Sequence, residues 1–226
     1  MASHSPARAH RERTAAAQRH GAGADAMRKD ATGYELMLVK LTEDKRRLHD
    51  LQSFERRAEV KLNLLPEYVP WIDGALQGGQ GVQDDVLMTV MVWRIDAGDL
   101  AGALEIARYA IANKLAMPDQ YKRNTACLLA EEFADNALRD MAAAAPSPED
   151  AEKIATALQQ VDDITANEDM PDEVRAKLNK AIGLTLGDKP SALKRLMRAF
   201  GLHDKVGVKK DIERLEREIK NSAGNG

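Results

Sequence analysis

Two pairs of adjacent carboxylates are the residues of this chain that come nearest to a catalytic centre. Asp84–Asp85 and Glu131–Glu132 have the side chains that hold Mg²⁺, and bound Mg²⁺ promotes phosphodiester cleavage. Adjacent residues on a helix point about 100° apart, so neither pair converges on one ion unaided. Acids of this kind are typical of helix ends and of surfaces. We therefore assign no catalytic and no metal-binding residue.

Other chemical signatures are weaker still. The five histidines, at positions 4, 10, 20, 49 and 203, are scattered and do not have zinc-ligand spacing. Cys127 is the single cysteine, which excludes a disulfide within the chain. The glycine-rich stretch at 78–81 is not followed by the Gly-Lys-Ser/Thr of a phosphate loop. The sequence predicts a binding protein without a cofactor.

Charge restricts the possible partners. The 33 Lys and Arg are outnumbered by 36 Asp and Glu, so the net charge is -3 and any nucleic-acid surface must be local. Residues 1–31 are basic and lack apolar anchors, which predicts a flexible basic arm; a terminus without a task is the alternative. The longest apolar stretch, residues 86–93, is too short to cross a bilayer. We expect an intracellular protein with no membrane partner.

The elements that position these charges are all predicted to be helices. Thr32 and Glu35 have capping-box spacing, and a long helix over residues 32–65 is expected to follow. Its leucines, chiefly Leu41, Leu48 and Leu51, resemble a coiled-coil seam that a second subunit would cover. Two prolines, at positions 66 and 70, are expected to break this helix.

The rest of the chain predicts helical hairpins. Two apolar helical stripes flank Gly98-Asp99, and the pattern returns at Gly187-Asp188, 89 residues later. This predicts a helical domain over residues 66–200 with tetratricopeptide-like αα-hairpins. Residues 201–226 are predicted to form a last amphipathic helix and a tail. The expected fold class is all-α.

Several stretches resemble the small terminase subunits of tailed temperate phages, the gpM family. They include "LLPEYVPWIDGALQGGQGVQDDVLMTVMVWRIDAGDLAGALEIARYAI", "MPDEVRAKLNKAIGLTL" and "GVKKDIERLERE". The resemblance covers about residues 30 to 220, and the run from 83 to 110 is highly specific. The Lys/Arg-rich C-terminal tail of that family has no counterpart before residue 226. If that tail binds DNA elsewhere, the task falls here to the N-terminal arm or the first helix.

The resemblance implies a ring-forming adaptor that recognises the cos packaging site on double-stranded phage DNA in the host cytoplasm. It also implies a large subunit that carries the ATPase and the nuclease, so we read the family's label "endonuclease subunit" as describing the complex. The expected DNA contacts are the cations of the arm and of the first helix: Arg8, Arg11, Arg13, Arg19, Arg28, Lys29, Lys40, Arg46 and Arg47. The expected docking site for the large subunit is a set of cations near the C-terminus: Lys209, Lys210, Arg214 and Arg217.

Two other functions fit the residues. A helical-repeat scaffold that binds only proteins would need no basic surface, and a DNA-binding assay at low salt separates it from the adaptor. A metal-dependent endonuclease would cut DNA with Mg²⁺ in the absence of a large subunit. In that case Asp84 and Asp85 are the carboxylates to substitute.

Overall fold

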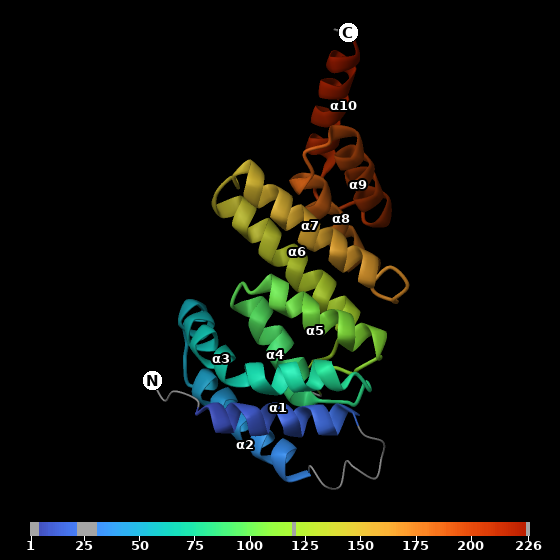
Figure 1. The fold of residues 1–226 in the computed structure, drawn as a ribbon. Helices are drawn as coiled ribbons and strands as arrows, with labels where there is room; N and C mark the ends of the chain where they lie inside the picture. Colours follow the sequence, from blue (N-terminus) through green and yellow to red (C-terminus); the bar gives the residue numbers. More distant parts are fainter. Residues whose placement is uncertain (1–4, 22–30, 119–120, 225–226) are drawn as a thin grey trace. The chain divides into compact units, whose positions relative to one another are not determined.

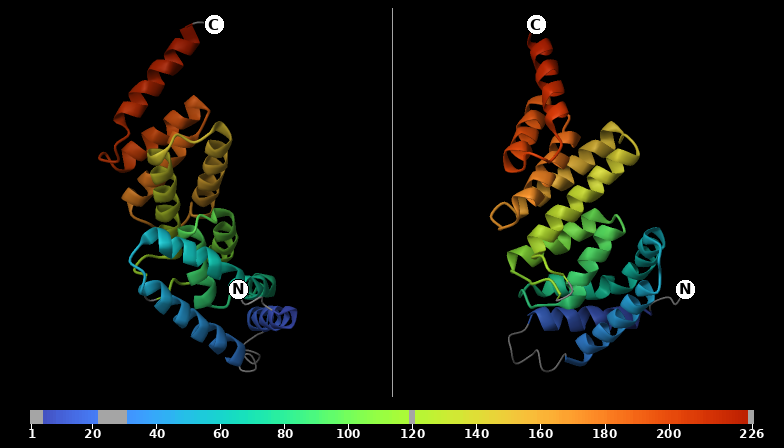
Figure 2. Two further views of the ribbon diagram at one scale, coloured as in Figure 1. Left: turned by 90° about the vertical axis from the view of Figure 1, so that its left-hand side faces the viewer. Right: turned by 180° about the vertical axis from the view of Figure 1, so that it is seen from behind.

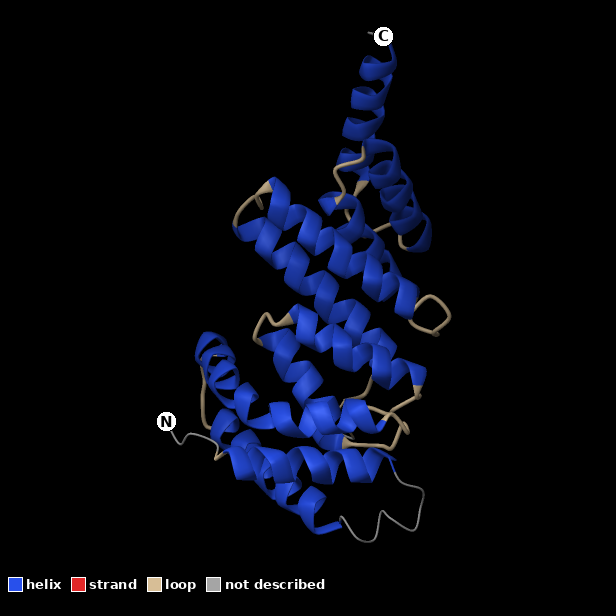
Figure 3. Ribbon diagram, in the orientation of Figure 1, coloured by secondary structure: helices blue, strands red, loops and turns tan. Residues whose placement is uncertain are grey.

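The structure is a computed structural model that describes residues 5–21, 31–118 and 121–224. Ten α-helices and no strands are found in these residues, which confirms the predicted all-α class (Figure 3). The chain divides into two compact units, Met1–Thr125 and Ala126–Gly226. This division differs from the predicted boundaries at residues 31, 65 and 200. No helix of the described ranges is long and apolar enough to cross a membrane.

The first unit contains five helices (Figures 1 and 2). In chain order they are α1 (Pro6–Gly21), α2 (Ala31–His49), α3 (Phe54–Gly78), α4 (Asp85–Asp96) and α5 (Leu100–Ala112). The central helix is α4, which packs against α2, α3 and α5. Nine of its twelve residues are buried, including Met88, Met91 and Trp93, because it has neighbours on several sides. A helix that is apolar on all sides is expected in such a place.

The predicted long helix is in fact two helices. Residues 50–53 separate α2 from α3, and the Ser53 hydroxyl caps α3 by accepting a hydrogen bond from the backbone N–H of Arg56 at 3.3 Å. The prediction that prolines end the helix is also wrong, because α3 continues through Pro66 and Pro70 to Gly78. Tyr68 and Trp71 are fully buried beside these prolines. Burial of such large aromatic side chains offsets a proline cost of about 3 kcal/mol.

The hairpin predicted around Gly98 is present as α4 and α5. Gly98 adopts a left-handed φ of 79°, and the Asp99 carboxylate accepts a hydrogen bond from the N–H of Gly102 at 3.0 Å to cap α5. The second copy starts its second helix in the same way, since Asp188 accepts from the N–H of Ser191 at 3.0 Å. Both predicted Gly-Asp helix starts are therefore confirmed, whereas the tetratricopeptide-like packing stays a prediction.

The second unit contains the remaining helices: α6 (Thr125–Ala143), α7 (Pro148–Ile164), α8 (Asp172–Thr185), α9 (Lys189–Leu202) and α10 (Lys209–Gly224). Helix α9 lies between α8 and α10 and packs on both. Its inner side joins a small apolar core with α10: Ala192, Leu196, Val208 and Leu215. Cys127, near the start of α6, is buried. The C-terminal helices therefore have a core of their own.

Candidate nucleic-acid interface

The N-terminal segment that was expected to be a flexible arm forms a helix over its described part. Helix α1 packs closely on α3, since a Cβ added to Gly74 would lie 2.2 Å from the Arg13 carbonyl oxygen and 2.7 Å from the Ala16 Cβ. Ala16 is fully buried at this contact. Small residues on both helices make the close approach possible. The flexible-arm prediction is therefore wrong for residues 6–21, whose arginines have defined positions.

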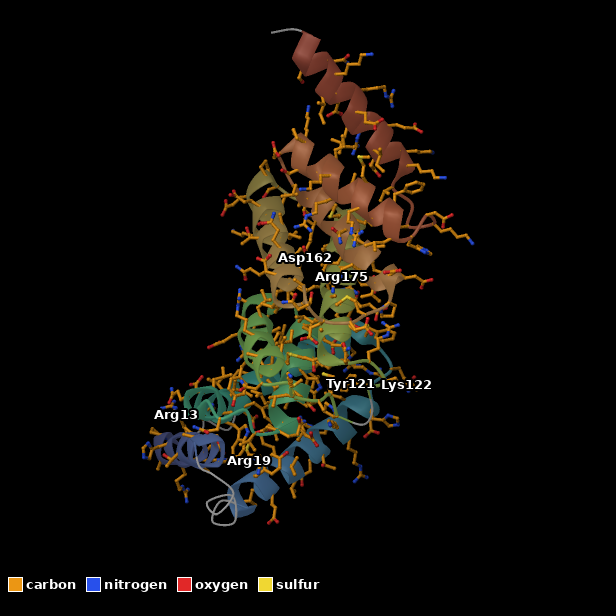
Figure 4. The ribbon with its side chains drawn as sticks, turned by 90° about the vertical axis from the view of Figure 1, so that its right-hand side faces the viewer. Arg13, Arg19, Tyr121, Lys122, Asp162 and Arg175 are labelled. Carbon is orange, nitrogen blue, oxygen red and sulfur yellow. The ribbon has the colours of Figure 1, made fainter. Side chains whose placement is uncertain are left out.

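Three of the predicted DNA-binding arginines lie on the solvent side of α1. Arg8 and Arg11 are exposed, and Arg8 forms an i,i+4 ion pair with Glu12 at 2.8 Å. Arg13, also exposed, is 3.9 Å from Asp73 of α3 (Figure 4). Surface ion pairs of this kind are weak and exchange readily for another anion. All three guanidinium groups are accessible from solvent.

Arg19, the fourth arginine of α1, has a structural role instead. It is 9% exposed, and its Nη2 donates to the Gln83 carbonyl oxygen at 3.0 Å. Its guanidinium lies over the ring of Tyr34, 3.5 Å from the centroid. Arg19 thus connects α1, α2 and the segment before α4 (Figure 4). These contacts within the fold leave little of the side chain exposed, and the DNA contact predicted for Arg19 stays a prediction.

Lys40 is likewise taken up inside the first unit. Its Nζ lies 2.6 Å from Asp44 Oδ2 and 3.0 Å from Glu67 Oε2. It also lies 4.4 Å from the centroid of the Tyr68 ring. The Tyr68 hydroxyl donates a hydrogen bond to Asp44 at 2.8 Å. Burial is the main cause that raises the pKa of Tyr68, and this hydrogen bond is the second. This cluster joins α2 to α3, so Lys40 has a structural role, and the DNA contact predicted for it stays a prediction.

The remaining predicted cations of the first unit divide into two groups. Arg46 and Arg47 are exposed on α2, and Arg47 lies 3.3 Å from Asp44. Arg28 and Lys29 fall outside the described residues. A cavity of about 460 Å³ lies beside the exposed arginines of α1, and its lining includes Arg8, Arg11, Glu12, Leu36, Met37 and Lys40. Of the predicted cations that the structure describes in this unit, the exposed ones therefore lie on α1 and at the end of α2.

The leucines predicted to contact another subunit are directed into the chain itself. Leu41 and Leu48 are 2% and 6% exposed, and Leu51 is half-buried. Within the chain, α3 and α4 pack beside α2, which accounts for the burial of these leucines; a coiled-coil contact with another subunit stays a prediction. The exposed apolar side chains of α2 are instead Leu36 and Val39, at 67% and 57% exposure.

The carboxylates proposed for a nuclease centre are used to build the fold. Asp84 is fully buried as the N-cap of α4, and its Oδ1 accepts from the N–H groups of Val86 and Leu87 at 2.9 and 3.0 Å. Its Oδ2 accepts from the Trp71 indole at 2.9 Å. Burial, with the charge of Asp84 adding to it, raises the pKa of the neighbouring Tyr34 to about 12. Asp84 is thus a cap whose two oxygens are both engaged.

The second acidic pair is also engaged in the fold. Glu131 lies 3.7 Å from Lys177 of α8, and Glu132 has interactions as well. Among the described residues, no group of three His, Cys, Asp or Glu side chains is placed to hold a metal ion.

The cations predicted to dock a large subunit lie on α10 in the second unit. All four, Lys209, Lys210, Arg214 and Arg217, are exposed. Arg214 pairs with Asp211 at 2.9 Å, and Lys209 lies 5.1 Å from the centroid of the Phe200 ring. The structure brings these residues onto one helix, and their docking role stays a prediction.

Sequence reasoning overlooked a basic helix in the same unit. Helix α9 has four cations and no acid within Lys189–Leu202, and Lys194 and Arg198 are exposed on it. Its signal was available in the sequence. Residues 174–226 contain 13 Lys and Arg against 6 Asp and Glu, whereas residues 126–173 contain 2 against 13.

Comparisons with known proteins establish the family. The model of the phage small terminase subunit family matches residues 38–173, which is more than half of the chain. The chain belongs to the phage small terminase subunit family. This small terminase subunit is also 49% identical over 220 residues to the "Terminase, endonuclease subunit" of Escherichia phage P2, a match that covers 96% of this chain and 86% of the relative. No solved structure matches the chain.

Proposed function

We propose that this small terminase subunit is a DNA-binding adaptor of phage genome packaging. It recognises the cos site on double-stranded phage DNA and recruits the large subunit, which carries the ATPase and the nuclease. Membership of the phage small terminase subunit family supports a role in phage genome packaging. The observation that carries the DNA-binding role is the presence of three exposed arginines, 8, 11 and 13, on α1, a helix that packing on α3 holds in place.

These arginines predict salt-dependent binding, because each phosphate contact releases condensed counterions from DNA. The slope of log affinity against log salt is about -0.9 per contact. Replacing Arg8, Arg11 and Arg13 together by Ala is expected to make the slope shallower by about 2 to 3. Fluorescence anisotropy measures this slope when a labelled cos duplex is titrated over a series of salt concentrations.

A matched control is Arg56→Ala, which removes an exposed cation from α3 in the same unit. We expect this control to bind as the unchanged protein does. If the triple substitution has the slope of the control, the α1 surface is not the DNA contact. If the unchanged protein binds no duplex even at low salt, the adaptor function itself is wrong, and a scaffold that binds only proteins is the better proposal.

A second candidate function, an intrinsic metal-dependent nuclease, is favoured by the name of the phage P2 relative, "Terminase, endonuclease subunit". On our proposal, purified protein with Mg²⁺ leaves cos DNA uncut, and cleavage appears when the large subunit is added. Asp84 is a poor test residue for this question, because Asp84→Asn removes a buried cap and affects folding. Cleavage by the subunit alone, resistant to further purification, would favour the nuclease.

We also propose that the protein assembles as a homo-oligomeric ring and that α10 docks the large subunit. A ring gathers the α1 surfaces of several copies around one DNA, so that weak contacts act together. The exposed Leu36 and Val39 on α2 support a contact between copies, because exposed apolar side chains gathered on one helix are typical of interfaces. The exposed cations of α10 support the docking role.

A further inference from the structure

Helix α9 has two exposed cations on one side, an arrangement that suits the binding of an anion. Lys194 and Arg198 are one helical turn apart on the same side of the helix, and both are exposed. Like charges at i,i+4 repel each other. Within the described residues, neither side chain has an acidic partner. Lys189 on the same helix differs, because Glu218 of α10 lies 3.0 Å from it.

The inward cation of α9 has a different task from the outward pair. Arg195 donates to Asp162 of α7 at 2.5 Å and to Asn179 of α8 at 3.2 Å. Arg175 of α8 also approaches Asp162, at 3.7 Å, and donates to the Thr165 carbonyl oxygen at 2.8 Å (Figure 4). Arg195 is therefore a positioning residue that connects α9 to α7 and α8. Its charge is neutralised within the fold.

Packing holds α9 from two further directions. A Cβ added to Gly183 of α8 would lie 2.6 Å from the Cδ2 of Leu196 and 3.1 Å from the Ala192 carbonyl oxygen, so α8 and α9 approach closely. On the α10 side, Leu196 and Ala192 share a core with Val208 and Leu215. The helix is thus fixed by three neighbours and keeps one side open. That open side contains Ser191, Lys194, Met197 and Arg198.

The connection between α8 and α9 is three residues long, from Leu186 to Asp188. A helix, a short turn containing glycine and a second helix are the components of DNA-binding helix-turn-helix motifs. In those motifs the second helix enters the major groove, which is wide enough for one α-helix. Here the second helix is the one without acids, and its open side presents long cationic side chains beside a small residue, Ser191.

We propose that α9 inserts into the major groove of double-stranded DNA, where Lys194 and Arg198 bind phosphates and guanine edges. This inference rests on the proposed DNA-binding function and assigns that function a second surface, in the other unit from α1. Arg198 is the side chain suited to a guanine, because guanidinium can donate to O6 and N7 together. Lys194 is suited to a phosphate as a point charge. The exposed Met197 between them offers an apolar contact.

The test compares two double variants of the full chain with the same loss of charge. Lys194→Ala with Arg198→Ala removes the open cations of α9. Lys153→Ala with Arg139→Ala removes two exposed cations from α6 and α7 in the same unit. Binding to a labelled cos duplex is measured by anisotropy over a salt series, and circular dichroism checks that each variant keeps its helices. We expect the α9 variant to lose at least about tenfold in affinity at low salt and about 2 in salt slope. The control variant is expected to keep the affinity and the salt slope of the unchanged protein.

Protection of guanine N7 from methylation by dimethyl sulfate reports directly on the major groove. The unchanged protein is expected to protect guanines of the cos duplex, and the α9 variant is expected to lose that protection. The variant of Arg8, Arg11 and Arg13 is expected to keep it, because α1 is assigned to phosphates. Absence of protection by the unchanged protein, or protection that survives the loss of both α9 cations, would overturn the major-groove assignment.

The outcomes separate this proposal from the function on which it rests. If the unchanged protein binds duplex and the α1 variant is weaker, but the α9 variant binds normally, only the α9 proposal is wrong. If the unchanged protein binds no duplex, both are wrong. An α9 variant that binds DNA normally but no longer binds purified large subunit would make α9 a protein-docking helix and would also overturn the proposal.

Discussion

At the scale of single residues, the same side-chain types serve opposite purposes in this subunit. Arg8 and Arg19 lie on one helix, yet the first faces solvent and the second is bound by Gln83 and Tyr34. Arg195 and Arg198, one turn apart, differ in the same way. Charge counted along the sequence therefore overstates the surface available to DNA. The groups that bind Arg19 and Arg195 lie far away along the chain.

Tyr34 gives a prediction for pH. Its pKa is raised to about 12, chiefly by burial, whereas an unfolded tyrosine titrates near pH 10. Folding therefore favours the neutral phenol. The stabilisation is fully present below about pH 10 and is lost as the pH rises towards about 12. The Tyr34 hydroxyl also accepts a hydrogen bond from the N–H of Asp85 at 3.1 Å, so Tyr34→Phe is expected to lower the free energy of unfolding at neutral pH.

The difference in free energy of unfolding between the unchanged protein and Tyr34→Phe is expected to narrow from pH 9.5 to about pH 11.5. Urea titrations at fixed pH measure it. Tyr68 and Tyr109 also have raised pKa values. The unchanged protein and Tyr34→Phe both contain these two tyrosines, so their contribution to the pH dependence cancels in the difference. A difference that stays constant over this range would mean that Tyr34 titrates normally in the folded chain.

At the scale of elements, close helix contacts depend on a few small residues. Gly74 allows α1 to lie against α3, and Gly183 allows α9 to lie against α8. These two contacts hold the two helices assigned to DNA. A substitution at either glycine thus tests whether the position of a cationic helix matters.

Gly74→Ala is expected to destabilise the contact between α1 and α3, because the new methyl group would meet the backbone of Arg13 and cannot displace it cheaply. Overpacking of this kind costs about 1–3 kcal/mol. Thermal unfolding and trypsin cleavage at the arginines of α1 measure the effect, and faster cleavage is expected. The matched control is Gly201→Ala on α9, where nothing lies within 4 Å of an added Cβ. If both variants are cleaved alike, α1 does not depend on this approach.

Most elements could be predicted from the sequence because their signals are local. Asp99 and Asp188 cap helices as their Gly-Asp context indicates, and the apolar repeat of residues 86–95 forms α4. The failures have non-local causes. Helix α3 continues through Pro70 because the residues around this proline are buried by other helices. Helix α1 is ordered because it packs closely against Gly74, which lies far along the chain. Of the candidate site, the exposed arginines could be predicted; the contacts of Arg19 with Gln83 and Tyr34, and of Lys40 with Glu67, could not.

At the scale of the whole molecule, the two units carry different distributions of charge. The first unit contains nearly equal numbers of basic and acidic residues. Its cationic surface therefore depends on which basic side chains form ion pairs within the fold. The second separates an acidic stretch, residues 126–173, from a basic one, residues 174–226. The family model ends at residue 173, so α8 to α10 lie almost wholly outside the match, whereas the phage P2 relative is similar along nearly the whole chain.

The proposed ring gives a prediction for assembly. Native mass spectrometry is expected to find a homo-oligomer, and Leu36→Ser with Val39→Ser is expected to shift it towards the monomer without unfolding it. The matched control is Leu62→Ser, an apolar side chain of α3 with 51% exposure. Substituting the buried Leu41 is expected to lower stability instead. An oligomer that persists in the α2 double variant would place the subunit contact elsewhere.

The buried Cys127 has a practical consequence for anyone who wishes to watch this protein at work. It is the single thiol of the chain, and a buried thiol reacts slowly with maleimide reagents while the fold is intact. A cysteine introduced on α1 or on the open side of α9 would therefore accept a fluorophore selectively in the otherwise natural sequence. Energy transfer to dyes on a duplex could then follow each helix as it meets DNA.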